Sequence, residues 1–242
     1  MPDLISTTAF SDGTAPEAAH DLFGAINRPG FRLHRLEMFN WGTFDSAGER
    51  TLGHVYRVDP AGGTTLLIGR NGSGKSTLVD ALLTLLVRPQ VRNYNVAAGA
   101  RKRERDERTY VKGAFERRSR EDDNRADVQF LRPHGTHYSV LLACFRNARK
   151  GRAFTLAVVL YLAVDGRCRK VYCFSTDERT IAGDFGGFYS MDKLTRQLRE
   201  RGFQTTEHYT EYYEWFRKAT GAQPQAMDSF NQTAAVKDNE RL

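Results

Sequence analysis

The segment that most constrains the fold of this chain is residues 64–87, TTLLIGRNGSGKSTLVDALLTLLV. An apolar run, a glycine-rich turn and a Leu-rich run follow one another there, which predicts a buried strand, a loop and a helix. Gly69, Gly74, Lys75 and Ser76 fit the spacing G-x-x-x-x-G-K-[ST]. Glycines can take positive φ and carry no Cβ, so successive N–H groups can close around an anion. The segment therefore predicts a phosphate-binding loop.

Individual loop residues have separate predicted roles in binding a nucleoside triphosphate. Lys75 is expected to reach the β- and γ-phosphates, and Ser76 to offer its hydroxyl to Mg²⁺. The positive end of the helix that starts near Lys75 adds its dipole. The candidate nucleotide-binding residues are Gly69, Arg70, Asn71, Gly72, Ser73, Gly74, Lys75, Ser76 and Thr77. The predicted cofactors are ATP and Mg²⁺; the alternative is a glycine-rich turn that binds nothing.

The helix after the loop is predicted to be buried. One apolar stripe has the spacing i, i+4, i+7, i+8. It consists of Leu78, Leu82, Leu85 and Leu86, and further apolar residues, Val79, Ala81, Leu83 and Val87, cover much of the remaining surface. Pro89 is expected to stop the helix, because a proline cannot continue the hydrogen-bond ladder.

Composition sets the broad class of the protein. The 242 residues, 40% of them hydrophobic, suffice for a substantial globular core. The net charge of +7 is compatible with a polyanionic partner, and equally with a basic nucleotide-binding fold that binds no nucleic acid. Three cysteines, Cys144, Cys168 and Cys173, lie in strand-like runs without metal-ligand spacing. The longest apolar run, residues 153–164, is too short to span a bilayer. We therefore expect a cytoplasmic protein with reduced thiols and no membrane contact.

The chain before the phosphate loop changes character near residue 31. Residues 1–30 mix small, polar and acidic residues and are predicted to be a flexible tail, with a possible short helix at 16–26. Residues 31–44 and 54–58 are predicted strands, joined by a turn-rich stretch. Trp41 and Phe44 could stack on adenine, but aromatic residues in a strand more often belong to the core.

Residues 92–125 are polar and rich in arginine, with charges of both signs. A solvated loop is the simpler interpretation, and a DNA-facing surface is the alternative. An island at residues 109–114, TYVKGA, is expected to be ordered.

Three predicted strands follow, at residues 138–146, 153–164 and 169–175. Their short links, including a tight Asp165-Gly166 turn, predict an antiparallel meander. The strand that ends at Asp165 superficially resembles the one that holds Mg²⁺ in related enzymes. The next residue is Gly166 rather than a water-activating Glu, so a hairpin is favoured.

The C-terminal part is predicted to be mainly helical. Residues 191–201 and 209–219 form amphipathic patterns that end at Gly202 and Gly221. Another element begins at residue 228. His134 and His137 could be metal ligands, but without a third partner nearby they are expected to lie in a loop.

Several of these motifs resemble the N-terminal half of an SMC-type ABC ATPase head. GRNGSGKST, preceded by RLEMFNWGTF and followed by TYVKGA, is most similar to the branch that contains MukB, MksB and JetC. The resemblance implies that Lys112 occupies the place of a DNA-sensing arginine. It also implies that FNQT is the Q-loop, so that Gln232 completes Mg²⁺ coordination beside Ser76.

The resemblance covers about residues 31–242 and implies an α/β P-loop fold of ABC/SMC-head type, whose N-terminal lobe carries an antiparallel β-subdomain. The family's signature motif and Walker B Asp-Glu pair are not found, so the catalytic residues are unknown. Residues 184–187, DFGG, only approximate a signature. We expect an excised half-head that binds ATP without turning it over, although a natural half with a separate complement is possible.

The resemblance also implies partners. They are the C-terminal half of the same head, a second head in a homodimer, double-stranded DNA, kleisin and KITE-like subunits, and a nuclease subunit. The leading function is a JetC-like motor of the Wadjet plasmid-defence type. The alternatives are a MukB/MksB or SbcC-like head in chromosome segregation or repair, and a non-catalytic nucleotide- or DNA-binding module.

Overall fold

The computed structural model describes residues 29–46, 54–92, 94, 106–119, 126–133, 137–163, 165–186, 191–223, 225–226, 228–229 and 232. For residues 116–119, 126–127 and 191–192 only the backbone is described. The predicted tail, residues 1–30, lies almost wholly outside these ranges, and so does His134. The predicted boundary between tail and domain stays a prediction.

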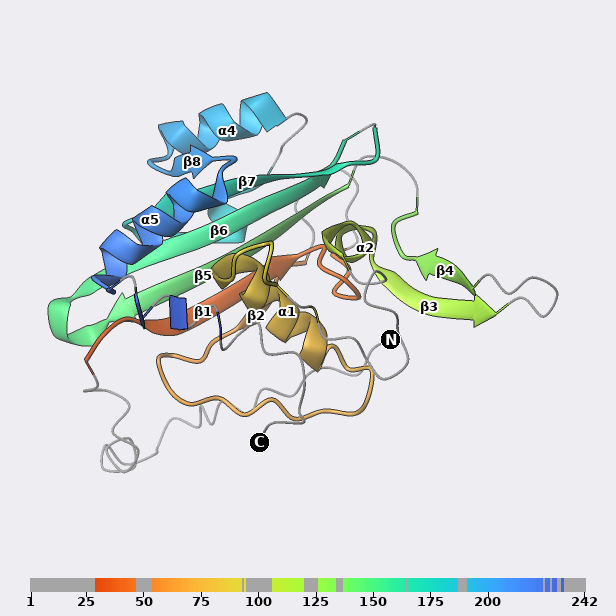
Figure 1. Ribbon diagram of the computed structural model, residues 1–242, viewed down its shortest axis with the longest axis horizontal. Coiled ribbons are helices and arrows are strands. Elements are labelled where there is room, and N and C mark those ends of the chain that lie inside the picture. The colour runs from red at the N-terminus through yellow and green to blue at the C-terminus, as the bar shows by residue number, and fades with distance from the viewer. Residues whose placement is uncertain are drawn as a thin grey trace.

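A six-stranded sheet forms the centre of the fold, with the strand order β2-β1-β5-β6-β7-β8 (Figure 1). Its strands are β1 (Arg32–Phe39), β2 (Tyr56–Val58), β5 (Tyr138–Asn147), β6 (Arg152–Leu162), β7 (Cys168–Ser175) and β8 (Gln204–Thr206). Every neighbouring pair is antiparallel. The predicted meander is therefore confirmed as β5, β6 and β7. The turn after β6 is also confirmed, since the Gly166 N–H donates to the Ala163 carbonyl at 2.9 Å.

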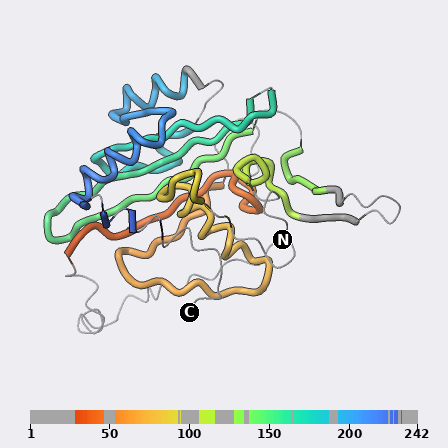
Figure 2. Tube along the Cα trace, in the orientation of Figure 1, coloured from red at the N-terminus to blue at the C-terminus, as the bar shows by residue number. Residues whose placement is uncertain are grey.

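Helices cover both faces of this sheet, giving three layers (Figures 1 and 2). They are α1 (Lys75–Leu86), α2 (Glu107–Lys112), α3 (Ile181–Asp184), α4 (Met191–Glu200) and α5 (Tyr209–Thr220), and a 3₁₀ turn lies at Ala148–Lys150. Helices α1, α2 and α5 share one hydrophobic cluster with the sheet, and α3 and α4 share the other. The predicted C-terminal helices are confirmed as α4 and α5.

The longest apolar run of the chain forms strand β6, which is covered on both faces. Leu156, Val158 and Leu160 belong to the cluster beneath α1 and α5, whereas Ala157 and Val159 belong to the cluster beneath α4. Successive side chains of a strand point to opposite faces, so a strand covered on both faces is apolar at every position.

The arginine-rich region contains more regular structure than a solvated loop. Its ordered island is α2, which begins with a capping box between Asp106 and Thr109 and ends at Gly113 with φ of 70°. Strand β3 (Ala114–Ser119) follows and pairs with β4 (Ala126–Phe130) in a separate hairpin that projects from the body (Figure 1). The loop prediction was wrong for β3, because the strand depends on pairing with a second segment.

No helix within the described ranges is both long enough and apolar enough to cross a membrane.

Candidate nucleotide-binding site

The phosphate loop connects residue 68 to the N-terminus of α1. Gly72 and Gly74 have φ of 82° and 91°, which residues with a Cβ rarely adopt. Gly69 is needed for close approach instead, since a Cβ there would lie 2.6 Å from the Ser73 hydroxyl oxygen. The loop therefore requires glycine at two positions for positive φ and at the third for close packing.

Helix α1 begins at Lys75 as predicted, with Gly74 as its N-cap. Gly74 provides no side-chain cap, and the first turn holds no acidic residue. The first N–H groups of a helix have no partner within the helix, and they carry its positive dipole end. This end of α1 therefore suits a phosphate, which can accept several of these N–H groups at once.

The Lys75 ammonium turns back over the loop. Its Nζ donates to the carbonyl oxygens of Gly69 at 2.6 Å and Arg70 at 2.9 Å. An ionised phosphate oxygen is a stronger acceptor than a carbonyl oxygen, so a bound nucleotide can replace these bonds. The donors, the loop shape and the helix end together fit the triphosphate of a nucleotide.

The segment leading into the loop differs from the prediction of a buried strand. Residues 64–70 have no regular structure, and the Leu66 and Ile68 side chains are 80% and 65% exposed. An extended segment becomes a strand only when another strand satisfies its N–H and C=O groups. In the part of the chain that the structure describes, no strand pairs with residues 64–70. Val79 of α1 is also 42% exposed, so the prediction that this helix is buried holds for one face only.

A tight turn at residues 40–46, here called the Trp41 turn, packs against the other side of the loop. Trp41 is fully buried, and its Nε1 donates to the Thr77 carbonyl oxygen at 3.0 Å. The Phe44 ring lies so near Gly74 that a Cβ there would be 2.8 Å from the ring. The core interpretation of both aromatic residues is confirmed, and neither ring is free to stack on adenine.

Sequence reasoning missed a buried polar group that joins this turn to α2 and β4. The Arg132 side chain donates to the carbonyl oxygens of Val111 at 2.9 Å and Gly42 at 3.0 Å, and pairs with Asp45 at 2.5 Å. Burial lowers the pKa of Arg132, and the hydrogen bond that Arg132 donates to Asp45 acts in the opposite direction. Its partners lie 21 to 92 residues away along the chain, so no local pattern could have revealed it.

The far end of α1 is also fixed by side chains from distant segments. The hydroxyls of Tyr209 and Tyr212 in α5 donate to the carbonyls of Leu86 at 3.0 Å and Leu85 at 2.9 Å. Arg92 donates to the carbonyls of Thr84 and Val87. These bonds satisfy carbonyls that have no partner within the helix. Helix α1 is thus held at both ends, by different elements.

Lys112, the predicted DNA-sensing residue, packs within the protein. Its Nζ lies 5.2 Å from the centre of the Phe130 ring, a cation–π contact between α2 and β4. The preceding Tyr110 stacks on Trp41, with ring centres 4.3 Å apart, and its hydroxyl bonds Asp80 in α1. The TYVKGA island thus has a structural role beside the loop, and DNA sensing by Lys112 stays a prediction.

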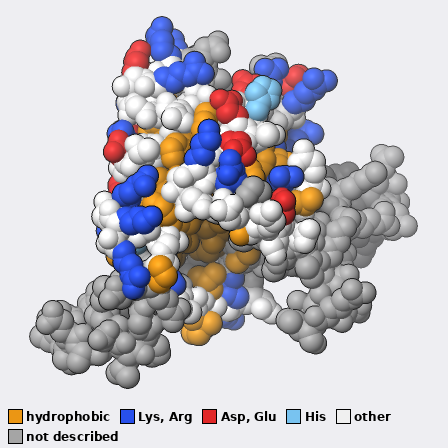
Figure 3. All heavy atoms as spheres, turned by 60° about the vertical axis from the view of Figure 1, so that its left-hand side comes forward, with side chains coloured by type: hydrophobic (Ala, Val, Ile, Leu, Met, Phe, Trp, Pro, Cys, Tyr) orange, Lys and Arg blue, Asp and Glu red, His pale blue; other side chains and the backbone are white. Residues whose placement is uncertain are grey.

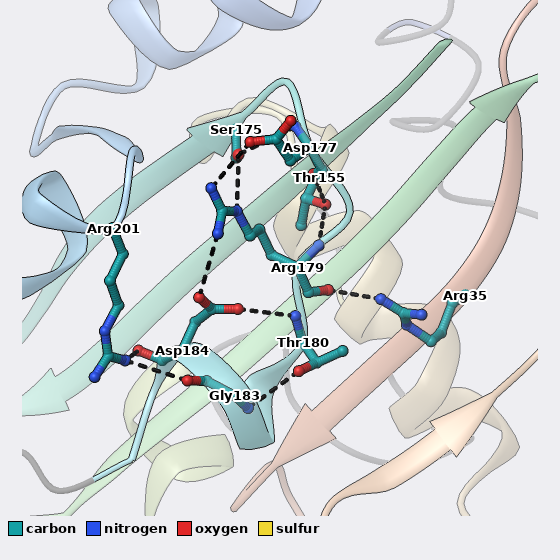
Figure 4. Close-up of polar contacts among 9 residues, drawn as sticks. All are labelled: Arg35, Thr155, Ser175, Asp177, Arg179, Thr180, Gly183, Asp184 and Arg201. Carbon is teal, nitrogen blue, oxygen red and sulfur yellow. Dashed lines mark hydrogen bonds and ion pairs between the residues drawn. The ribbon is translucent and has the colours of Figure 1, made fainter. Parts of the chain in front are cut away.

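Asp184, the first residue of the glycine-rich run, also has a structural role (Figure 4), whereas Gly187 lies outside the described residues. The Asp184 carboxylate accepts the Thr180 N–H at 3.1 Å and lies 3.8 Å from the Arg179 guanidinium, while Arg201 donates to the Asp184 carbonyl. These contacts fix α3 on the face of the sheet opposite α1, where Ile181 is buried.

The remaining candidate residues are dispersed. Asp165 lies in the β6–β7 turn, where its carboxylate accepts the Arg167 N–H at 2.9 Å. Gln232 lies exposed in a helical position, and its pairing with Ser76 on Mg²⁺ stays a prediction. Among the residues that the structure describes, no group of three or more His, Cys, Asp or Glu side chains could hold a metal ion. All three cysteines are free, and burial raises the pKa of Cys168 to about 12.

Comparison with known proteins supports the nucleotide-binding interpretation over part of the chain. A family model described as the P-loop containing region of an AAA domain matches residues 33–101. The matched stretch contains all of β1 except its first residue, together with β2, the phosphate loop and α1. No curated protein matches the chain. The chain therefore carries a P-loop nucleotide-binding region within a mixed α/β fold that has an antiparallel sheet.

Proposed function

We propose that this chain binds Mg²⁺-ATP as the N-terminal part of the ATPase head of an SMC-like DNA motor, of the JetC type that acts in plasmid defence. The observation that carries the nucleotide part is the phosphate loop, whose glycines lead directly into the uncapped N-terminus of α1. Backbone N–H groups of residues 69–77 and the Lys75 ammonium bind the phosphates. Ser76, with Gln232 as a second ligand, binds Mg²⁺, which neutralises phosphate charge.

Exposed apolar surface beside the loop supports a further part of the head. Leu66 and Ile68 are exposed, and a cavity of about 510 Å³ lies between β1, α1 and the segment before the loop. Leu33, Leu67 and Leu82 are among its lining residues. Figure 3 shows hydrophobic side chains in a hollow on this side of the molecule. Contiguous exposed apolar surface marks interaction sites, and we propose that the C-terminal half of the head covers it, as the family resemblance implies.

The remaining family-level partners are part of the same proposal. A second head would close over the nucleotide, with kleisin, KITE-like and nuclease subunits attached in the cytoplasm. A chromosome-segregation or repair head of the MukB/MksB or SbcC type is the alternative within this class. A nucleotide-binding module without catalysis is the alternative outside it, and it requires the same loop.

The test of nucleotide binding is calorimetric titration of the purified chain with Mg²⁺-ATP. Lys75→Ala should weaken binding at least tenfold, because it removes the ammonium that neutralises phosphate charge. Lys150→Ala is the matched control, since Lys150 is an exposed lysine in the β5–β6 turn. Equal affinities for wild type and Lys75→Ala would overturn the proposal.

Double-stranded DNA is the proposed substrate of the complete motor. Besides the net charge of +7, exposed basic residues lie at the β5–β6 connection: Arg149 and Lys150 in the turn, and Arg152 at the start of β6. Figure 3 shows Lys and Arg side chains along the side of the molecule that contains this turn. Phosphate contacts release counterions, so affinity for duplex DNA should fall steeply with salt. If the chain does not bind DNA at low salt, this turn is not a DNA surface. The same conclusion follows if charge reversal at these three positions leaves the affinity unchanged.

A further inference from the structure

The Trp41 turn fixes the phosphate loop from the side opposite the exposed segment 64–70. The Trp41 Nε1–H donates to the carbonyl of Thr77, which directly follows Ser76 in the first turn of α1. Gly42 lies in the same turn with φ of 56°, and a Cβ there would be 2.7 Å from the Thr77 methyl carbon. Phe44 packs on Gly74, the N-cap. One short turn thus contacts the two residues that flank Lys75 and Ser76.

The Trp41 turn is itself rigidly held. Trp41 and Phe44 form a two-residue antiparallel bridge, with reciprocal N–H to carbonyl bonds of 3.2 and 3.0 Å. Asn40 and Ser46 close the turn through two bonds of 3.1 Å each. Tyr110 stacks on the indole from the α2 side, with an angle of 11° between the rings. A side chain fixed by packing and by hydrogen bonds can hold a functional group within the narrow limits that binding requires.

We propose that Trp41 is a positioning residue for the nucleotide site: through its hydrogen bond to Thr77 it sets where the Ser76 hydroxyl, in the first turn of α1, meets the Mg²⁺ of the bound nucleotide. The inference rests on the proposed nucleotide binding. Its physical basis is that different residues hold the two ends of α1. Tyr209, Tyr212 and Arg92 bond the C-terminal end, and the Trp41 turn bonds the N-terminal end. Loss of the indole N–H should therefore act on the site and not only on stability.

Trp41→Phe tests this assignment, because it keeps an aromatic ring and removes the donor. In this variant the Thr77 carbonyl still accepts the backbone N–H of the residue four positions later, as in any α-helix. Tyr212→Phe is the matched control, since it removes a buried α5 hydroxyl that donates to the Leu85 carbonyl at the other end of α1. Both proteins are compared with wild type by thermal unfolding and by calorimetric titration with ATP, in Mg²⁺ and in EDTA.

We expect Trp41→Phe to weaken Mg²⁺-ATP binding about five- to tenfold, the range of a single lost hydrogen bond. ATP binding in EDTA should change less than twofold, because Ser76 acts on the metal. Tyr212→Phe should lower the unfolding temperature while changing both affinities less than twofold. Unchanged Mg²⁺-ATP affinity in Trp41→Phe, or equal losses in the two variants, would overturn the inference.

A second variant covers the case in which Trp41→Phe does not fold. Phe44→Leu withdraws the ring from Gly74 and leaves Trp41 in place, and the same selective loss of Mg²⁺-ATP affinity is expected. Lys75→Ala separates this inference from the one on which it rests. If wild type and Lys75→Ala bind ATP equally, the proposed function fails; if only Lys75→Ala binds weakly while both aromatic variants match wild type, the positioning role fails.

Discussion

Replacement of Arg132 by methionine should strongly destabilise the protein, because it removes a buried donor shared by three segments. Two acceptors would keep other partners: the Tyr110 carbonyl also accepts the Gly42 and Gly113 N–H groups, and the Asn40 carbonyl accepts the Ser139 hydroxyl. The Asp45 carboxylate, with a side chain 36% exposed, can turn to water.

The carbonyls of Val111 and Gly42 would then lose the Arg132 donor. An unsatisfied buried acceptor costs about 1–3 kcal/mol, so the expected loss is about 2–6 kcal/mol. At about 2–4 °C per kcal/mol for a chain of this size, a loss near the middle of that range lowers the unfolding temperature by about 8–16 °C.

Thermal unfolding followed by circular dichroism, together with urea titration, measures this loss. Arg132→Lys keeps the charge but not the planar fork, so it should fall between wild type and Arg132→Met. Arg152→Met, at the exposed first residue of β6, should change stability by less than about 0.5 kcal/mol. A loss below about 1 kcal/mol in Arg132→Met would refute the assignment of Arg132 as the group that joins the Trp41 turn, α2 and β4.

Three further predictions concern the loop, turnover and pH. Gly74→Ala should abolish detectable ATP binding in calorimetry, because its Cβ would lie 2.8 Å from the Phe44 ring at a φ of 91°; affinity equal to wild type would show that the loop tolerates a Cβ. The chain alone should release phosphate from ATP at a rate about 10²–10⁴ below that of a complete site, since its sequence has no Asp-Glu pair after an apolar strand that would supply a general base; turnover near about one per second that disappears in both Lys75→Ala and Asp165→Asn would contradict this. Burial holds the pKa of His34 below 6.5, so the unfolded chain binds a proton at this residue more readily than the folded chain. Neutral His34 therefore contributes its full stability above about pH 6.5, and that stability is lost as the pH falls toward the folded pKa. His34→Gln should therefore show a smaller fall in urea midpoint than wild type between about pH 7.5 and 5.5, and an equal fall would exclude His34 as a source of pH dependence.

Local sequence patterns determined the elements whose causes are local. The phosphate loop and the start of α1 follow from glycines and a Lys-Ser pair at fixed spacing, and the match at residues 33–101 agrees with that interpretation. The β5–β7 meander follows from short links between apolar runs, and the end of α5 follows from a glycine that takes positive φ. In each case the residues that decide the conformation lie within a few positions of one another.

Only the tertiary structure decided which groups meet. Trp41 reaches Thr77 across 36 residues, Arg132 reaches Gly42 across 90, and Tyr212 reaches Leu85 across 127. Residues 64–70 have the composition of a buried strand, yet Leu66 remains exposed because no described strand pairs with the segment. Hydrogen bonds between distant segments and the pairing of strands depend on how the chain folds back on itself, and a pattern read along the sequence contains no record of that arrangement.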